Sequence, residues 1–186
     1  MIKSNINKSN SYSNIMAEII DASGFETFLE LGVDTGYTTK KILDIAKDLK
    51  KVYCVDIRDS SIIKYESEFK DKIDYFFNNK TDDFFSKDII TEVDCVFIDA
   101  DHSYTQSRID FLNSFKILTD GGIIFLHDTY PPNIEMTNST RNGDTYKLYL
   151  ELSSPEWNDK IDIINLPIYD GLTIIRKRIS KKIFTL

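Results

Sequence analysis

Both histidines of the chain, His102 and His127, follow apolar runs and lie close to acids. The sequence reads VFIDADHSY around the first and IIFLHD around the second, which brings in Asp99 and Asp128. An imidazole can accept a proton near neutral pH, and an acid after a buried strand is costly unless it is used. We therefore predict that His102, Asp99 and His127 are catalytic. In the alternative, structural reading, His127 orients a loop and His102 begins a helix capped by Asp101.

The stretch FLELGVDTG places an acid, Glu30, and two glycines, Gly32 and Gly36, where a strand turns into a helix. A dinucleotide fingerprint would need further glycines at Asp34 and Tyr37, and the phosphate-loop pattern fails as well. An acid inside the turn would repel a pyrophosphate. The turn therefore favours a ligand that carries no phosphates.

Two more polar residues follow strand-like runs. Asp56 ends VYCVD, and an acid at this place can accept hydrogen bonds from ribose hydroxyls. Asn79 follows IDYFFN, and its amide can pair with the edge of a base because it both donates and accepts. With the acid and glycines of the turn, these residues describe a pocket for a nucleoside that carries a cation.

These side chains need a scaffold that brings strand ends together. Strand-like runs alternate with helical patterns, which predicts βαβ units and a parallel sheet whose carboxyl ends form the site. The final stretch IDIINLPIYDGLTIIRKR has the pattern of an antiparallel hairpin. A short helix from Tyr12 precedes the first strand, and we expect the helix 104–118 to bury Ile109, Leu112, Phe115 and Leu118. The other expected strands are 27–31, 51–57, 73–78, 94–100 and 121–128, and the other helices are 38–49, 60–69, 81–89 and 145–152.

Length and composition suit one domain at 12–186 after a flexible N-terminus at 1–11. The formal net charge of −7 argues against broad binding to nucleic acid or to anionic membranes. The apolar runs stay short of the roughly 18 residues that a membrane span needs, so we expect a cytoplasmic protein without membrane partners. Cys54 and Cys95 lie in apolar runs, which indicates reduced core thiols.

The pair FLELGVDTG and VYCVDI resembles the first two motifs of class I S-adenosylmethionine-dependent methyltransferases. The stretches FIDADHSY and GGIIFLHD are similar to those of a small bacterial subgroup of this family. The resemblance implies a Rossmann-like α/β fold: a seven-stranded, mostly parallel sheet with a C-terminal antiparallel hairpin and helices on both faces. It also implies S-adenosylmethionine as the cofactor, with Asp56 on the ribose and Asn79 near adenine. The remaining implied cofactor-binding residues are Glu30, Gly32, Thr35, Gly36, Ile57 and Asp99.

The motif DADHSY is also similar to that of metal-dependent O-methyltransferases, in which acids after the fourth and fifth strands bind a divalent cation. The matching positions here are Asp99 and Asp128, and oxygen ligands of this kind suit Mg²⁺ or Mn²⁺. The third ligand of those enzymes, usually Asn, falls at Thr129. Their catalytic lysine falls at His102.

The resemblance predicts O-methylation of a small-molecule acceptor, such as a sugar or a metabolite hydroxyl, with Mg²⁺ assistance. Loop 129–145 would cover the acceptor, and Tyr130, Arg141 and Tyr146 would contact it. The short chain leaves room for help from a partner subunit in a homo-oligomer. Three alternatives stay open: a methyltransferase acting on nucleic acid or protein, a noncatalytic binding subunit, and an enzyme that uses the same fold for other chemistry.

Overall fold

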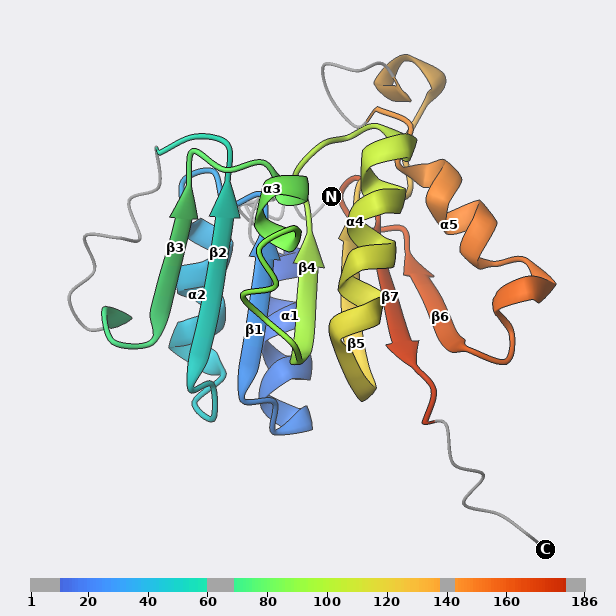
Figure 1. The fold of residues 1–186 in the computed structure, drawn as a ribbon. Helices are drawn as coiled ribbons and strands as arrows, with labels where there is room; N and C mark the ends of the chain where they lie inside the picture. The colour runs from blue at the N-terminus through green and yellow to red at the C-terminus, as the bar shows by residue number, and fades with distance from the viewer. Residues whose placement is uncertain (1–10, 60–68, 138–142, 180–186) are drawn as a thin grey trace, which may run out of the picture.

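The computed structural model describes residues 11–59, 69–137 and 143–179 (Figure 1). The N-terminal segment 1–10 lies outside these residues. The expected helix at 60–69 also lies outside them, except for Phe69. The elements are α1 (Ser11–Ser23), β1 (Thr27–Leu31), α2 (Tyr37–Ile45), β2 (Lys51–Asp56), β3 (Ile73–Phe77), α3 (Thr81–Phe85), β4 (Val93–Ile98), α4 (Tyr104–Ile117), β5 (Leu118–His127), the 3-10 helix η4 (Ile134–Thr137), α5 (Tyr146–Leu152), the 3-10 helix η5 (Pro155–Trp157), β6 (Ile161–Leu166) and β7 (Leu172–Lys177).

The strands form one seven-stranded sheet in the order β3-β2-β1-β4-β5-β7-β6. Strands β1 to β5 pair in parallel, whereas β7 lies antiparallel between β5 and β6. The expected Rossmann-like sheet with its closing hairpin is therefore confirmed. The chain runs outward from β1 to β3 and then crosses back to β4 on the other side of β1. This crossover creates a switch point between β1 and β4, where open α/β sheets bind their ligands.

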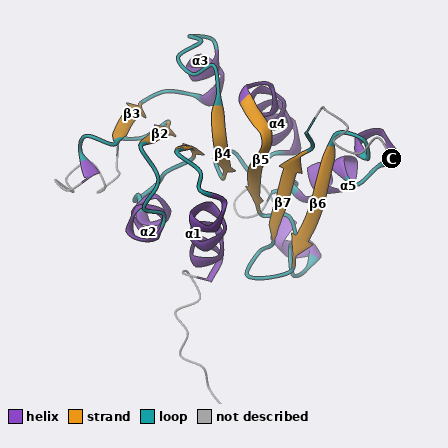
Figure 2. Cartoon of the chain, turned by 90° about the horizontal axis from the view of Figure 1, so that it is seen from below, coloured by secondary structure: helices purple, strands orange, loops and turns teal. Residues whose placement is uncertain are grey.

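Helices cover both faces of the sheet (Figure 2). Apolar residues of α1 and α2, such as Met16 and Ile42, pack in one cluster with alternate residues of the strands, such as Phe28 and Phe97. The intervening strand residues face a second cluster on the opposite side, which includes Phe111 of α4. Because helices cover both faces of the central strands β1 and β4, these strands reach the surface only at their two ends.

The buried face of α4 is only partly the one expected. Leu118 is buried, and Leu112 and Phe115 pack against the second cluster as predicted, but the most buried positions of the helix are different ones. Ile109 is exposed, and the fully buried residues are Ser107, Asp110, Phe111 and Ser114. These residues follow the three- and four-residue spacing of one helical stripe, but only one of them is apolar. The two serines are small enough to let the helix approach the sheet, and the carboxylate of Asp110 accepts a hydrogen bond from Gln106. A buried stripe of this composition gives almost no apolar periodicity in the sequence.

The two cysteines are free and buried, as expected. Cys54 lies beside Glu30 in the register of β2 and β1, and Cys95 lies beside Phe28 on the other side of β1. A whole strand thus separates the two thiols. Within the described ranges, no helix combines the length and apolar character that crossing a membrane requires.

Candidate active site

The turn after β1 meets the end of β4 at the switch point. The Gly32 amide donates a hydrogen bond to the Val55 carbonyl at 2.9 Å, and the Asp99 amide donates to the Leu31 carbonyl at 2.8 Å. Gly32 has a φ of +89°, and a Cβ added here would lie 2.2 Å from the Asp99 carbonyl oxygen. Glycine is required at this position because the backbone after β4 leaves no room for a side chain and φ is positive.

Asp56 holds the glycine turn from β2. Its Oδ2 accepts hydrogen bonds from the amides of Val33 and Asp34, both at 2.8 Å, and its Oδ1 accepts from the Arg58 amide at 2.7 Å. The Arg58 guanidinium also reaches Asp34 at 3.1 Å. A carboxylate has about four lone-pair sites, so roughly one site stays available to a ligand.

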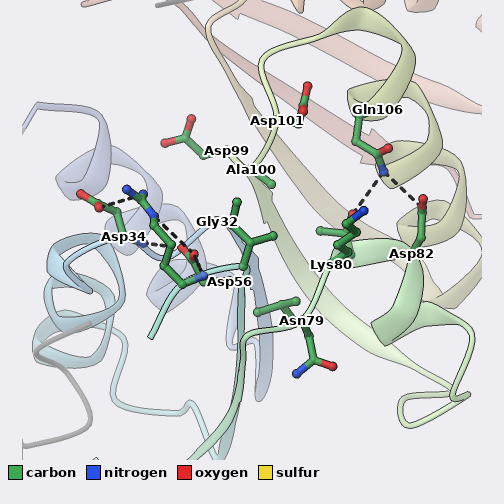
Figure 3. A pocket seen from close by; sticks show the side chains of 14 residues that line it. Gly32, Asp34, Asp56, Asn79, Lys80, Asp82, Asp99, Ala100, Asp101 and Gln106 are labelled. Carbon is green, nitrogen blue, oxygen red and sulfur yellow. Dashed lines mark hydrogen bonds and ion pairs between the residues drawn. The ribbon is translucent and has the colours of Figure 1, made fainter. Parts of the chain in front are cut away.

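A cavity of about 340 Å³ opens between these turns (Figure 3). This volume falls at the small end of the range for ligand pockets. Five of the predicted cofactor-binding residues line it, whereas Glu30, Thr35 and Gly36 lie outside its wall. The lining residues are Gly32, Asp34, Val55, Asp56, Ile57, Arg58, Asn79, Lys80, Thr81, Asp82, Asp99, Ala100, Asp101 and Gln106.

The side chain of Asn79 is occupied elsewhere, although the residue lines the cavity. Its amide donates to the Phe77 carbonyl at 2.8 Å and accepts from Lys87 at 2.8 Å, and Figure 3 shows it directed away from Gly32. The polar groups at this end of the cavity come from residues that the sequence reading missed. The Gln106 amide nitrogen donates to Asp82 at 3.1 Å and to Thr81 at 3.2 Å.

Glu30 lies buried beneath the glycine turn, as expected. Its carboxyl accepts a hydrogen bond from the Thr39 hydroxyl of α2. Burial raises the pKa of Glu30 to about 8, with smaller contributions from Asp99 and Asp56, while the bond from Thr39 opposes this rise. A large share of the Glu30 side chains is therefore neutral at pH 7 in the unliganded protein.

The three residues predicted to be catalytic come together with the predicted metal ligand Asp128, in a ring of alternating carboxylates and imidazoles. The His102 Nε2 lies 3.4 Å from the Asp128 Oδ2 and 3.8 Å from the Asp99 Oδ1. The His127 Nδ1 lies 3.3 Å from the Asp99 Oδ1 and 3.3 Å from the Asp128 Oδ1. His102 is the most exposed member, at 37%, whereas His127 is almost buried, at 9%. Asp99 belongs to this ring and to the cavity wall.

Neighbouring carboxylates affect the protonation of His127. Burial alone would lower its pKa, but the neighbouring carboxylates of Asp99 and Asp128 outweigh this effect and raise the pKa to about 9. Burial also raises the pKa of Asp128, against the opposing charge of His127. The two carboxylates therefore favour the protonated form of His127, and its Nδ1 is placed to orient both of them.

The loop before α5 fixes the backbone at His102. The Asp144 amide donates to the His102 carbonyl at 2.9 Å, and the Asp144 carboxylate accepts from the Tyr104 amide at 2.6 Å. A Cβ on Gly143 would lie 1.9 Å from the His102 carbonyl oxygen. The helix cap is Ser103, which accepts from the Gln106 amide, so the expected cap at Asp101 was wrong. Asp101 instead accepts from the Ser103 amide.

An aromatic residue of α1 covers the ring. The Tyr12 ring centroid lies 4.6 Å from that of His127 and 6.1 Å from that of Tyr169, which precedes β7. Burial, and next the charge of Asp99, raise the pKa of Tyr12 above its usual range. Its hydroxyl forms a hydrogen bond with Thr38 near the start of α2. The sequence predicted a helix from Tyr12, but nothing local placed this residue at the site.

Thr129, the position matching a third metal ligand, is turned away from the ring. Its hydroxyl donates to the Asn165 side chain of β6 at 3.4 Å, and Asn165 donates back to the Thr129 carbonyl at 3.2 Å. Of the residues expected at the acceptor, Tyr130 is exposed and Arg141 falls outside the described residues. Tyr146 lines a second cavity of about 730 Å³ together with His102.

Comparisons with known proteins agree with this geometry. Residues 29–129, more than half of the 186 residues, match a family model described as a methyltransferase domain. Among curated proteins, no significant match was found. One similar structure is the O-methyltransferase from Bacillus cereus in complex with S-adenosylhomocysteine, at 16% identity and a TM-score of 0.69, covering 95% of this chain and 84% of that chain.

Two further solved structures share the fold. The S-adenosylhomocysteine-bound methyltransferase PaMTH1 from Podospora anserina is 20% identical, with a TM-score of 0.67, and covers 90% of this chain and 78% of that chain. The O-methyltransferase TomG from Streptomyces achromogenes, in complex with S-adenosylmethionine, is 13% identical, with a TM-score of 0.69, and covers 90% of this chain and 79% of that chain. The protein therefore belongs to the methyltransferase domain family and is an enzyme with the class I methyltransferase fold.

Proposed function

We propose that the enzyme transfers a methyl group from S-adenosylmethionine to a hydroxyl of a small-molecule acceptor. The observation that carries this proposal is the double position of Asp99. This residue lines the cavity at the switch point and is also a member of the His–Asp ring. A cofactor in the cavity and an acceptor at the ring would therefore meet at one carboxylate.

The charges of the cavity suit a cationic nucleoside. Five aspartates line the cavity against two cations, Arg58 and Lys80, so carboxylates prevail in its wall. The glycine turn also has no phosphate-binding pattern. In this proposal the remaining acceptor site of Asp56 takes a ribose hydroxyl. The methionine part of the cofactor lies over the turn that contains Gly32, Thr35 and Gly36, with Glu30 beneath it.

Methyl transfer to a hydroxyl requires a close nucleophile and an outlet for its proton. In this proposal His102 receives this proton when no cation is bound. Its side chain reaches solvent, and Asp128, 3.4 Å from its Nε2, would stabilise the imidazolium that forms. His127 positions the two carboxylates from the buried side. Asp99 and Asp128 would hold a divalent cation, and such an ion would lower the pKa of an acceptor hydroxyl.

The second cavity suggests where the acceptor binds. It adjoins the cofactor cavity through Ala100 and Asp101, and His102, Tyr146 and Lys147 also line it. Its volume of about 730 Å³ is in the range of pockets for small molecules. A small acceptor held there would lie beside the exposed imidazole of the ring.

A labelled-methyl assay tests the proposed function. The enzyme would be incubated with S-adenosylmethionine carrying a labelled methyl group and with panels of hydroxylated small molecules, nucleic acid and protein. We expect label in a hydroxylated small molecule, and loss of this transfer in Asp99→Asn. Asp74→Asn is the matched control, because it neutralises a β3 acid that pairs with Lys51 away from both cavities. Label only in nucleic acid or protein would refute the assignment of the acceptor.

A further inference from the structure

The ring contains three ligand atoms arranged as a metal site, and one of them is a nitrogen. Asp99, His102 and Asp128 each offer one atom, and these atoms all lie within 4.8 Å of one another. The third ligand of the metal-dependent O-methyltransferases, usually Asn, falls at Thr129 in this sequence. In the structure the Thr129 hydroxyl is bonded to Asn165 of β6, and His102 stands in the third position.

The distances from His102 to the two carboxylates are short enough for one ion to touch the imidazole and either carboxylate. Two ligand atoms that each lie about 2.1 Å from a metal ion can be at most about 4.2 Å apart. The His102 Nε2 lies 3.4 Å from the Asp128 Oδ2 and 3.8 Å from the Asp99 Oδ1. Both separations fall below this limit, so these pairs can share an ion without rearrangement.

The surroundings of the three residues have the features of a supported site. His127 faces Asp99 and the other oxygen of Asp128 from the buried side, which is where a second layer of hydrogen bonds orients metal-binding carboxylates. The backbone of His102 is held by Asp144 and abuts Gly143. These contacts restrict both the carboxylates and the segment that carries the imidazole, so little ordering remains for an ion to impose.

We propose that Asp99, His102 and Asp128 form a three-ligand site for a first-row transition metal, with Mn²⁺ bound in preference to Mg²⁺. Mg²⁺ favours oxygen ligands and near-ideal octahedral geometry, whereas an imidazole nitrogen suits transition metals. This inference deepens the proposed function and rests on it for the role of the metal. A ligating nitrogen cannot also accept a proton, so a loaded site takes His102 out of the base role.

Electron paramagnetic resonance of Mn²⁺ with the full-length protein, freed of metal by a chelator, tests the site directly. We expect the protein to bind Mn²⁺, an excess of Mg²⁺ to compete poorly, and the spin-echo signal to show modulation from a ligating nitrogen. Labelling the histidines with a different nitrogen isotope should change this modulation, which identifies the ligand in the unmutated protein. His102→Gln should remove it and weaken Mn²⁺ binding by at least about tenfold.

Thr129→Val is the matched control, because it removes the hydroxyl of the competing position at nearly constant volume. It should leave both the nitrogen modulation and the Mn²⁺ affinity unchanged. The inference is overturned if Mn²⁺ does not bind, if Mg²⁺ binds as tightly, if the modulation persists in His102→Gln, or if Thr129→Val weakens binding more than His102→Gln does.

Binding of S-adenosylhomocysteine, measured on the same samples, separates this inference from the proposed function. Retained binding in both variants shows that their cofactor site is folded. If S-adenosylhomocysteine binds but Mn²⁺ binding does not depend on His102, only the metal inference fails. If S-adenosylhomocysteine does not bind to the unmutated protein, the proposed function fails regardless of the metal result.

Discussion

Glu30→Gln should remove a pH-dependent loss of stability that the buried carboxyl imposes. Glu30 is fully buried under the glycine turn, and burial raises its pKa from 4.5 to about 8. The folded protein therefore holds the Glu30 proton more tightly than the unfolded chain does. As the pH rises from 4.5 towards 8, the unfolded chain loses this proton first, so the free energy of unfolding decreases. Glutamine has nearly the same shape and does not titrate.

The size of the effect follows from the interval between the two pKa values. Each pH unit within it changes the free energy of unfolding by about 1.4 kcal/mol. Over the interval from 4.5 to about 8, this amounts to at most about 5 kcal/mol. Water penetration and relaxation around the charged form would reduce this value. We expect the advantage of Glu30→Gln over the unmutated protein to grow by about 2 to 4 kcal/mol between pH 5 and pH 8.

Urea unfolding of both proteins at a series of pH values measures this difference. Groups that titrate independently of Glu30 cancel when the two curves are subtracted. Glu26→Gln is the control, because it removes an exposed acid just before β1 that pairs with Lys50, and it should cost less than about 1 kcal/mol at every pH. A difference between Glu30→Gln and the unmutated protein that does not change with pH would refute the argument.

Two further substitutions test the packing around the site. Gly32→Ala should strongly destabilise the protein, because the new Cβ would lie 2.2 Å from the Asp99 carbonyl oxygen. Gly24 also has a positive φ, but nothing lies within 4 Å of a Cβ added there. Gly24→Ala should therefore cost only about 1–2 kcal/mol in thermal unfolding. Tyr12→Ala should remove the ring packed 4.6 Å from His127 and lower the methyl-transfer rate, whereas Tyr12→Phe should keep most of it. Equal rates in the two Tyr12 variants would contradict the packing role.

The sheet and the grouping of polar side chains at its strand ends were predictable because their signals are local. TFLEL forms β1 as predicted, and the rule that ligands bind at strand ends correctly gathered His102, His127, Asp99 and Asp128. The ring itself was not predictable, because its distances depend on how β4 and β5 pair.

Other features depend on contacts between distant segments. Tyr12 reaches His127 only because α1 packs across the sheet, and Asp144 reaches the start of α4 from a loop forty residues later. The exposure of Ile109 was missed because the buried stripe of α4 is largely polar. Periodicity reports apolar residues, so it cannot identify a helix face whose burial depends on small side chains and hydrogen bonds.

Calorimetric titration with S-adenosylhomocysteine tests most directly whether the cavity between β1 and β4 is the cofactor site. We expect binding to the unmutated protein and to Asp74→Asn, and a much weaker interaction with Asp56→Asn, because Asp56 holds the turn and has one acceptor site left for the ribose. Equal binding to Asp56→Asn and to the unmutated protein, or no binding to any of the three, would contradict the account.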